Sequence, residues 1–243
     1  MEVINYNELD FSKLKKLDVL SSESDIYTDK DKKHVYKIFK TDLAIYELTL
    51  KSEKLKLLEN KKMMNSIVVP SAKIVGRSLV GIREDYIDGV DLCDAKESYT
   101  DKQLLSVLLN ISKDLEQMHK DKIIVSDLNF GNIRLDKQMN HHFLDVLSYS
   151  IDKIPPNAIS YILSEYLKKH KKNISPSKNT DKISYLMLAI QLFTDKCFFD
   201  ITDYDFDKKA EQIKDLELLR EMYEDLRNYY VKDVPYLHEL IRG

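Results

Sequence analysis

The chain of 243 residues has little of what disulfide scaffolds, flexible linkers and repeat proteins are made of. It contains two cysteines, five glycines and five prolines, and it has no tryptophan, internal repeat or low-complexity segment. Two cysteines are too few for a disulfide framework, and Cys93 and Cys197 lack the spacing of metal ligands. We therefore expect ordinary buried thiols in a reducing, cytoplasmic compartment, and a chain that is compact throughout.

An excess of positive charge and long apolar runs are also missing. The 38 lysines and arginines nearly balance 41 aspartates and glutamates, which gives a net charge of −3, so we expect no basic surface for nucleic acid or for an anionic membrane. The longest apolar run, residues 185–193, contains Gln191 and is shorter than the roughly 20 residues that span a bilayer. Residues 1–13 have no basic region followed by an apolar run, so no signal peptide is expected there.

One stretch, residues 123–145, places three polar residues at fixed intervals between short apolar runs. Asn132 follows Asp127 by five positions, and Asp145 follows Asn132 by thirteen. A turn would present Asp127 and bring Asn132 back, and a short hairpin would return Asp145 from the other side, so that three oxygen-bearing side chains converge on one pocket. Because 41 acidic residues can produce such a pair by chance, the flanking motifs carry the argument.

The residues before this stretch alternate like β-strands and then take a helical period. Residues 17–39 form three short runs rich in β-branched and aromatic residues, which predict an antiparallel meander, and Lys37 lies in the last run. Leucines at helical spacing predict a helix between residues 42 and 61. Two further strands are expected at residues 67–75 and 78–82.

The rest of the chain is mainly helical in its period. Helices are predicted from Thr100, which suits an N-cap, to His119 and from Asn157 to His170. Residues 183–193 are almost continuously apolar, which predicts a helix buried on all sides that opens near Asp181. Apolar side chains at positions 213, 216, 219, 223 and 226 predict one or two further helices near the C-terminus.

In this order the motifs resemble those of a small, divergent protein kinase-like domain of the eukaryotic protein kinase fold. The spacing of Asp127, Asn132 and Asp145 is similar to that of a kinase catalytic loop followed by its metal-binding aspartate. The resemblance implies an α+β, two-lobed fold. A small antiparallel sheet with one helix would form residues 1–88, and a mainly helical lobe with the catalytic loop would form residues 89–243.

The resemblance also implies a reaction, the transfer of a phosphoryl group from ATP to a hydroxyl group, with a protein serine or threonine as the substrate. Asp127 would accept or orient the proton of the acceptor, and Lys37 would contact the α- and β-phosphates. A glutamate of the helix after Lys37 should hold this lysine. Glu53 fits the register best, and Glu47 is the alternative.

Nucleotide and metal contacts follow from the same resemblance. Residues 84–92 are similar to a kinase hinge, so Asp85 and Ile87 are candidate nucleotide contacts, together with Ser22 in the turn that would cover the phosphates. Asn132 and Asp145 would bind Mg²⁺, which favours hard oxygen ligands, and through it the nucleotide. An aspartate that hydrogen-bonds the catalytic-loop backbone is also expected, and Asp181 fits that position.

The sequence departs from the kinase pattern at three places. The turn at residues 21–25 has no glycine, and its Glu23 and Asp25 would repel phosphate, so weak ATP affinity is expected. Ser126 precedes the catalytic-loop aspartate in place of the usual arginine, and Asn129 stands in place of a lysine. Asp-Phe-Gly is replaced by residues 145–147, which read Asp-Val-Leu.

These departures leave two alternatives to an active protein kinase. A pseudokinase that acts as a binding module would account for the turn without glycine and for Leu147. A small-molecule kinase of the aminoglycoside or choline type would account for the loop that lacks the lysine. The short interval of 42 residues from Asp85 to Asp127 argues against the second alternative, since those enzymes usually insert helices there.

Overall fold

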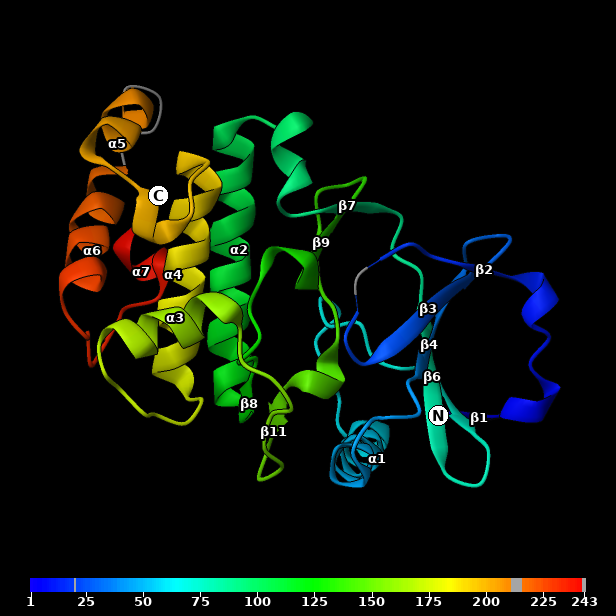
Figure 1. The fold of residues 1–243 in the computed structure, drawn as a ribbon. Coiled ribbons are helices and arrows are strands. Elements are labelled where there is room, and N and C mark those ends of the chain that lie inside the picture. The colour runs from blue at the N-terminus through cyan, green and yellow to red at the C-terminus, as the bar shows by residue number, and fades with distance from the viewer. Residues whose placement is uncertain (20, 211–215, 242–243) are drawn as a thin grey trace. The chain divides into compact units, whose positions relative to one another are not determined.

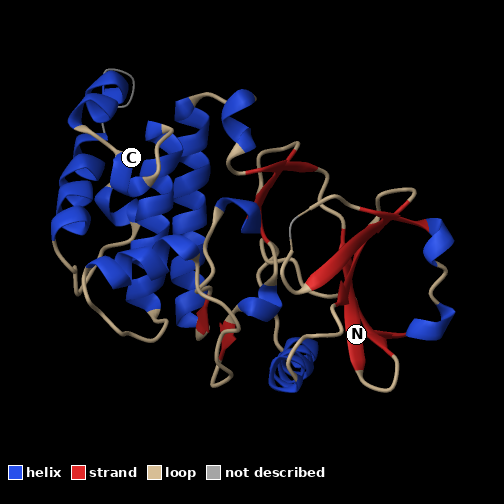
Figure 2. Ribbon diagram, in the orientation of Figure 1, coloured by secondary structure: helices blue, strands red, loops and turns tan. Residues whose placement is uncertain are grey.

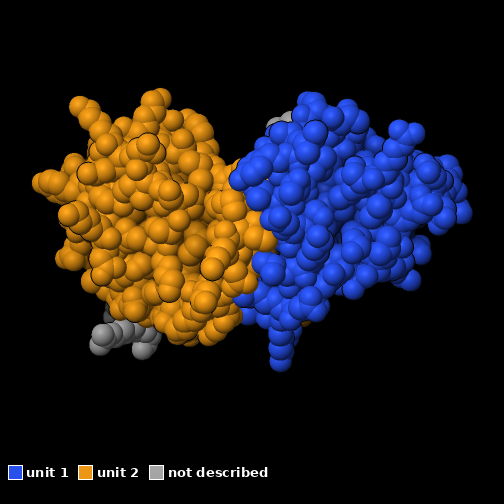
Figure 3. Space-filling view, turned by 90° about the horizontal axis from the view of Figure 1, so that it is seen from below, with its two compact units in different colours: residues 1–89, 142–147 blue, residues 90–141, 148–243 orange. Residues whose placement is uncertain are grey.

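The computed structural model describes residues 1–19, 21–210 and 216–241, which form two compact units. Unit 1 contains residues 1–89 and 142–147, and unit 2 contains residues 90–141 and 148–243; Figure 3 distinguishes them by colour. The sequence predicted one boundary after residue 88. The division seen here follows Gly89, and residues 142–147 return to unit 1.

Unit 1 is built on a six-stranded sheet with the strand order β1-β5-β6-β4-β3-β2 (Figure 1). The strands are β1 (Glu2–Asn5), β2 (Leu14–Lys16), β3 (Ser24–Asp29), β4 (His34–Phe39), β5 (Ala72–Val75) and β6 (Leu79–Asp85). The sheet is mixed, because β1 runs parallel to β5 while the other neighbours pair antiparallel. The prediction of a wholly antiparallel sheet is wrong at this edge. The N-terminal residues, for which no strand was expected, add beside β5.

The meander of β2, β3 and β4 is antiparallel as predicted, but its first strand is displaced. Residues 17–20 were expected to form that strand, whereas β2 covers Leu14–Lys16; Leu20 lies outside the described residues. A turn leads into β3, in which the Ser21 hydroxyl accepts a hydrogen bond from the Ser24 backbone amide at 3.2 Å. β3 and β4 pair so that Ile26 lies opposite Lys37.

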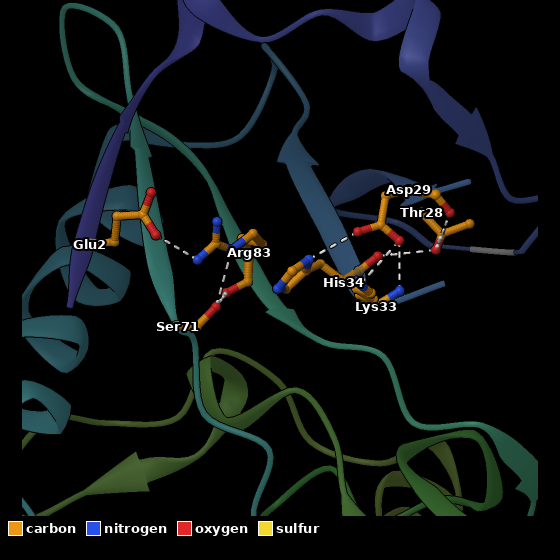
Figure 4. A network of polar contacts seen from close by, with 7 residues as sticks. All are labelled: Glu2, Thr28, Asp29, Lys33, His34, Ser71 and Arg83. Carbon is orange, nitrogen blue, oxygen red and sulfur yellow. Dashed lines mark hydrogen bonds and ion pairs between the residues drawn. The ribbon is translucent and has the colours of Figure 1, made fainter. Parts of the chain in front are cut away.

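Polar side chains connect parts of this sheet to each other at two places (Figure 4). Between β3 and β4, the Asp29 carboxylate lies 2.9 Å from the His34 ring and also accepts the His34 backbone amide at 3.3 Å. At the parallel edge, Arg83 of β6 donates to Glu2 of β1 at 2.6 Å and to the Ser71 hydroxyl at 3.2 Å. The arginine therefore ties the unexpected strand to the sheet.

Helix α1 (Ile45–Asn60) follows β4, within the predicted range. Its buried side chains recur at helical spacing and belong to Leu50, Lys51, Lys54, Leu55 and Leu58. Two lysines thus share the buried face with the leucines. This is unusual, because lysine is almost never fully buried unless it is paired.

Strands dominate unit 1, whereas helices dominate unit 2 (Figure 2). The helices of unit 2 are α2 (Asp101–Lys120), α3 (Tyr161–Lys169), α4 (Lys178–Thr194), α5 (Asp203–Ala210), α6 (Leu216–Asn228) and α7 (Leu237–Leu240). The remaining strands are short and are β7 (Gly89–Asp91), β8 (Ile123–Ile124), β9 (Ile133–Asp136), β10 (His141–Phe143) and β11 (Ser150–Ile151). Two residues of β10 and one of β7 belong to unit 1, and the other residues of these strands belong to unit 2. The chain is therefore an α+β protein.

The predicted helices of unit 2 are present, with small changes at their ends. Thr100 is the N-cap of α2 and forms a capping box with Gln103. Helix α4 is buried along nearly its whole length and packs against α2, α3, α5 and α6. Of the apolar positions expected in the last helices, Leu219, Tyr223 and Leu226 are buried, and Ile213 lies outside the described residues.

The two cysteines are free and exposed, which corrects the expectation that they are buried. Cys93 and Cys197 each stand at the N-cap of a short 3-10 helix, outside the α-helices whose apolar faces fill the core. None of the described helices is long and apolar enough to cross a membrane.

Candidate functional site

A buried ion-pair cluster in unit 1 contains Lys37 and Asp145, two residues that the sequence assigned to one site. The Lys37 ammonium group lies 3.3 Å from Asp145 Oδ1 and 3.0 Å from Glu84 Oε2. Only 14% of the Lys37 side chain and 4% of the Glu84 side chain are exposed. Both carboxylates therefore hold the lysine in a site that is largely shielded from water.

Pairing between strands explains how Lys37 meets Glu84. Ile82 of β6 lies directly opposite Lys37 of β4. Side chains two residues apart on a strand point to the same face, so Glu84 lies on the Lys37 face. The alternation along β6, which places Glu84 on the same face as Ile82, was the signal in the sequence that could have identified Glu84.

Backbone hydrogen bonds bring Asp145 to this cluster. The Val68 amide donates to the Phe143 carbonyl at 2.9 Å, and the Phe143 amide donates to the Ser66 carbonyl at 2.7 Å. These bonds fasten the segment that returns to unit 1. Asp145 itself has a left-handed backbone with φ of 60°, a conformation that is uncommon for residues other than glycine.

The expected pairing of Lys37 with Glu53 is wrong. Glu53 is exposed on α1, and the carboxylates that contact Lys37 among the described residues belong to Glu84 and Asp145. Glu47, the alternative, is half-buried and does not pair with Lys37 either. The physical reason is the rotation of α1, which turns lysines rather than glutamates to its buried face.

The two lysines of α1 complete the cluster. Lys51, which is 1% exposed, donates to Glu23 Oε2 at 2.7 Å. Lys54, which is fully buried, donates to the Leu147 carbonyl at 2.8 Å. Sequence reasoning missed both lysines, although their spacing of three residues among the leucines of α1 placed them on the buried face.

Burial and neighbouring charges perturb three pKa values in the cluster. Burial alone would lower the pKa of Lys37, but the Glu84 and Asp145 carboxylates outweigh burial and raise this pKa above its ordinary value. Burial raises the pKa of Glu84, while Lys37 opposes the rise. Burial, helped by the charge of Lys51, lowers the pKa of Lys54 to about 7.

In unit 2, two asparagines orient the carboxylate of Asp127. Asp127 Oδ1 accepts a hydrogen bond from the Asn129 side-chain amide at 3.1 Å, and Oδ2 accepts one from the Asn132 side-chain amide at 3.0 Å. Asn129 Oδ1 in turn accepts the Asn132 backbone amide at 3.1 Å. Asn129, which stands where the resemblance would place a lysine, thus holds Asp127 in one orientation.

The predicted contact of Asp181 with the loop before Asp127 is confirmed. Asp181, fully buried in α4, accepts the backbone amides of Val125 at 2.6 Å and Ser126 at 2.9 Å. The ring of His119 lies 3.0 Å from the same carboxylate. Ser126 has a left-handed backbone with φ of 62°, so these bonds hold a conformation that is costly for a residue other than glycine.

The remaining candidate residues lie in unit 1. Ser22 is exposed in the turn between β2 and β3. Asp85 is exposed at the end of β6, and Ile87 follows it in a half-buried position. The nucleotide contacts that were expected of these three residues stay predictions.

The donor chemistry of Asn132 and Asp145 suits magnesium. Among the described residues, no group of three or more histidine, cysteine, aspartate or glutamate side chains could hold a metal ion. Mg²⁺ needs fewer protein ligands, since it commonly binds one or two carboxylates together with phosphate oxygens and water. Asn132 in unit 2 directs its amide nitrogen to Asp127, which leaves its side-chain carbonyl oxygen as the possible ligand; Asp145 belongs to unit 1.

These contacts bring together some of the predicted residues and replace others. Lys37 meets Asp145, and Asp127 meets Asn132, whereas Glu84 takes the place expected for Glu53.

A scan against models of known protein families finds no match to this chain, and a search of curated proteins finds none either.

Proposed function

We propose that this protein is a two-lobed, kinase-like phosphotransferase that transfers the γ-phosphoryl group of ATP to the hydroxyl of a protein serine or threonine. The observation that carries the proposal is the 3.3 Å contact between Lys37 and Asp145, which stand 108 positions apart in the chain. Phosphoryl transfer depends on cations that hold the phosphates and on carboxylates that hold the metal. A strand lysine against a loop aspartate supplies one of each.

The proposed role of Lys37 is to bind the α- and β-phosphates. Its pKa is raised, so the ammonium group stays charged across the physiological range. Glu84 would position the lysine, a task that the resemblance assigned to a glutamate of the helix. Ser22, Asp85 and Ile87 would contact the nucleotide around it.

The proposed role of Asp127 is to accept the proton of the acceptor hydroxyl. As the oxygen–phosphorus bond forms, the proton passes to the carboxylate, and the bond to the β-phosphate oxygen of the leaving ADP breaks. Hydrogen bonds from Asn129 and Asn132 orient the carboxylate for this step. Mg²⁺, with oxygen ligands from Asn132 and Asp145, would neutralise charge on the phosphates.

A pseudokinase that binds nucleotide without transferring phosphate is the second candidate. Glu23 favours the pseudokinase, because its carboxylate stands in the turn expected over the phosphates and forms an ion pair with Lys51. The charge-assisted contacts of the proposed site are nevertheless retained, and such contacts are about twice as strong as the neutral hydrogen bonds of a glycine-rich turn.

The test is incubation with labelled ATP and magnesium. Three acceptors should be compared: the protein itself, a generic protein substrate and a panel of small hydroxyl-bearing metabolites. We expect label on protein, and no label with Asp127→Asn. Nucleotide binding without transfer would support the pseudokinase, transfer to metabolites alone would support a small-molecule kinase, and absence of nucleotide binding would overturn the proposal.

A further inference from the structure

Helix α1 brings positive charge to a place where the resemblance predicts a glutamate. Lys51 and Lys54 are both buried, while the acidic partner of Lys37 comes from β6 as Glu84. The helix thus carries buried lysines where a glutamate was expected, and the glutamate that pairs with Lys37 lies on a second strand. Lys51 is therefore a buried cation whose role the proposed reaction has not used.

The partner of Lys51 is a residue of the turn before β3. Glu23 Oε2 lies 2.7 Å from the Lys51 ammonium group. The backbone of the turn is fixed independently, since the Lys40 amide donates to the Glu23 carbonyl at 2.9 Å and the Lys40 ammonium group donates to the Ser21 carbonyl at 2.7 Å. Loss of the Glu23–Lys51 contact therefore leaves other bonds to hold the turn.

Burial differs sharply between the two partners. The Lys51 side chain is 1% exposed, whereas the Glu23 side chain is 26% exposed. A buried charge needs a partner, because removing one partner from a buried pair leaves an uncompensated charge. Lys51 is thus the fixed member of the pair, and the carboxylate, which solvent reaches, is the member that another anion can replace.

Electrostatic coupling links Lys51 to the rest of the cluster. Burial is the main cause of the lowered pKa of Lys54, and the charge of Lys51 adds to it; the same charge opposes the rise that burial causes in the pKa of Glu84, the carboxylate that holds Lys37. The geometry agrees, since Lys51 and Lys54 share the buried face of α1 and Lys54 donates to the carbonyl of Leu147, two residues after Asp145. Lys51 therefore belongs to the same charged group as Lys37. Phosphate oxygens accept charge-assisted hydrogen bonds from ammonium groups as carboxylate oxygens do.

We propose that Lys51 is a second phosphate-binding cation of the nucleotide site, and that the Glu23 carboxylate occupies it until a phosphate group of the nucleotide takes its place. The inference rests on the proposed function, because it assumes that ATP binds at Lys37. It adds that the acidic turn competes with the phosphates through Lys51 as well as repelling them. Glu23 thereby sets the affinity for ATP.

Nucleotide titrations test the exchange. Dissociation constants for ATP and for adenosine are measured with magnesium for the parent protein, Glu23→Gln and Lys51→Met. Glu23→Gln should bind ATP about tenfold more tightly, and Lys51→Met about tenfold more weakly, with adenosine affinity unchanged in both; one charge-assisted hydrogen bond accounts for effects of this size. Lys73→Met, which removes the Lys73–Glu59 ion pair between β5 and α1, is the matched control and should leave both affinities unchanged.

A charge-reversed double variant separates phosphate binding from a structural ion pair. Glu23→Lys combined with Lys51→Glu can re-form an ion pair, so a purely structural role predicts recovery of both thermal stability and ATP affinity. The proposal predicts that ATP affinity stays low even where thermal stability recovers. If this variant does not fold, the opposite shifts of Glu23→Gln and Lys51→Met decide the matter.

The outcomes distinguish this inference from the proposed function. Unchanged ATP affinity in Lys51→Met, or an equal loss of ATP and adenosine affinity, would overturn the inference. Loss of ATP affinity in Lys37→Met, measured alongside, would still uphold the nucleotide site. A parent protein that binds no nucleotide would overturn both.

Discussion

Asp127 and Asp145 carry the same functional group, but their surroundings assign them different tasks. Asp145 contacts a lysine, so its carboxylate belongs to a charged cluster that can bind phosphates and metal. Asp127 accepts hydrogen bonds from two neutral side-chain amides, which orient the carboxylate. Under the proposed function, Asp145 acts on the nucleotide and Asp127 acts on the acceptor.

The first prediction separates these two roles by substitution. Asp145→Ala should lose magnesium-dependent ATP binding and turnover together. Asp127→Ala should keep its ATP affinity while turnover falls by roughly two to four orders of magnitude, the usual contribution of a positioned acid or base. Nucleotide titrations and initial rates on the same preparations, after circular dichroism has shown that both variants are folded, measure the contrast. Transfer by Asp127→Ala at the parental rate would refute the assignment of the catalytic loop.

The second prediction concerns the pH dependence of stability and belongs to Lys54. Its pKa falls from an ordinary value of 10.5 to about 7 in the folded protein, mainly because of burial. Between these values the unfolded chain binds a proton that the folded protein does not, so the contribution of Lys54 to the free energy of unfolding rises with pH. The contribution is least favourable below about pH 7, where Lys54 is charged in both states.

Urea unfolding of the parent protein and of Lys54→Met at pH 7, 8 and 9 measures this contribution. The free energy of unfolding of Lys54→Met minus that of the parent should decrease steadily as the pH rises. For Lys73→Met, which removes a partly exposed lysine from the same unit, the corresponding difference should stay nearly constant. A constant difference for Lys54→Met as well would mean that Lys54 remains protonated throughout this range.

At the scale of elements, helix α4 fixes the backbone of the loop that precedes Asp127. One buried carboxylate, that of Asp181, accepts two backbone amides and also contacts the ring of His119. The opposite nitrogen of that ring lies 2.7 Å from the Tyr236 hydroxyl. The network therefore connects the loop, two long helices and the chain near α7 through a few hydrogen bonds.

The third prediction tests this network with Asp181→Asn. An amide retains one oxygen acceptor, but its nitrogen would face a backbone donor, so at least one buried amide loses its partner. We expect the free energy of unfolding to fall by about 2–4 kcal/mol and turnover to fall as the loop loses its conformation. Chemical denaturation and initial rates are the measurements.

A matched control for the third prediction lies on the surface near α4. Asp233, which is 95% exposed on its side chain, pairs with Lys182 of that helix. Asp233→Asn should change stability little, because exposed ion pairs contribute about 0–1 kcal/mol. Equal stability losses in Asp181→Asn and Asp233→Asn would show that the buried network does not determine the loop.

Elements with a clear period were predictable from the sequence, whereas the partners of individual charges were not. Helix α4 and strand β4 follow from the spacing of their apolar residues, whereas the contact of Asp181 was expected from the resemblance alone. The period of α1 showed which residues share a face, but Lys51 and Lys54 lie in the same stripe as the leucines. The partner of Lys37 depended on the rotation of α1 and on the register of β6, which arise from packing between elements distant in sequence.

At the scale of the whole molecule, we expect the proposed enzyme to need no phosphate on its own chain to become active. Kinases that are switched on by such a phosphate commonly hold it with the arginine beside the catalytic-loop aspartate, and here Ser126 occupies that position. Contacts of its own also hold the segment that follows residue 151. The Ser160 amide donates to the Ser126 carbonyl at 3.0 Å, and the Ser160 hydroxyl caps α3.

The fourth prediction follows from this self-supported segment. Treatment with a broad-specificity phosphatase, followed by removal of the phosphatase, should leave the initial rate of phosphoryl transfer unchanged. Mass spectrometry before and after treatment establishes that any phosphate has been removed, and Asp127→Ala gives the background rate. Ser160→Ala, in contrast, should lower the initial rate of transfer whether or not phosphatase was used. Loss of the cap weakens α3 by about 1 kcal/mol and loosens the segment that is bonded to Ser126. A parent protein that loses its activity with its phosphate would show that a covalent charge, rather than the Ser126–Ser160 contact, organises the region beside Asp127.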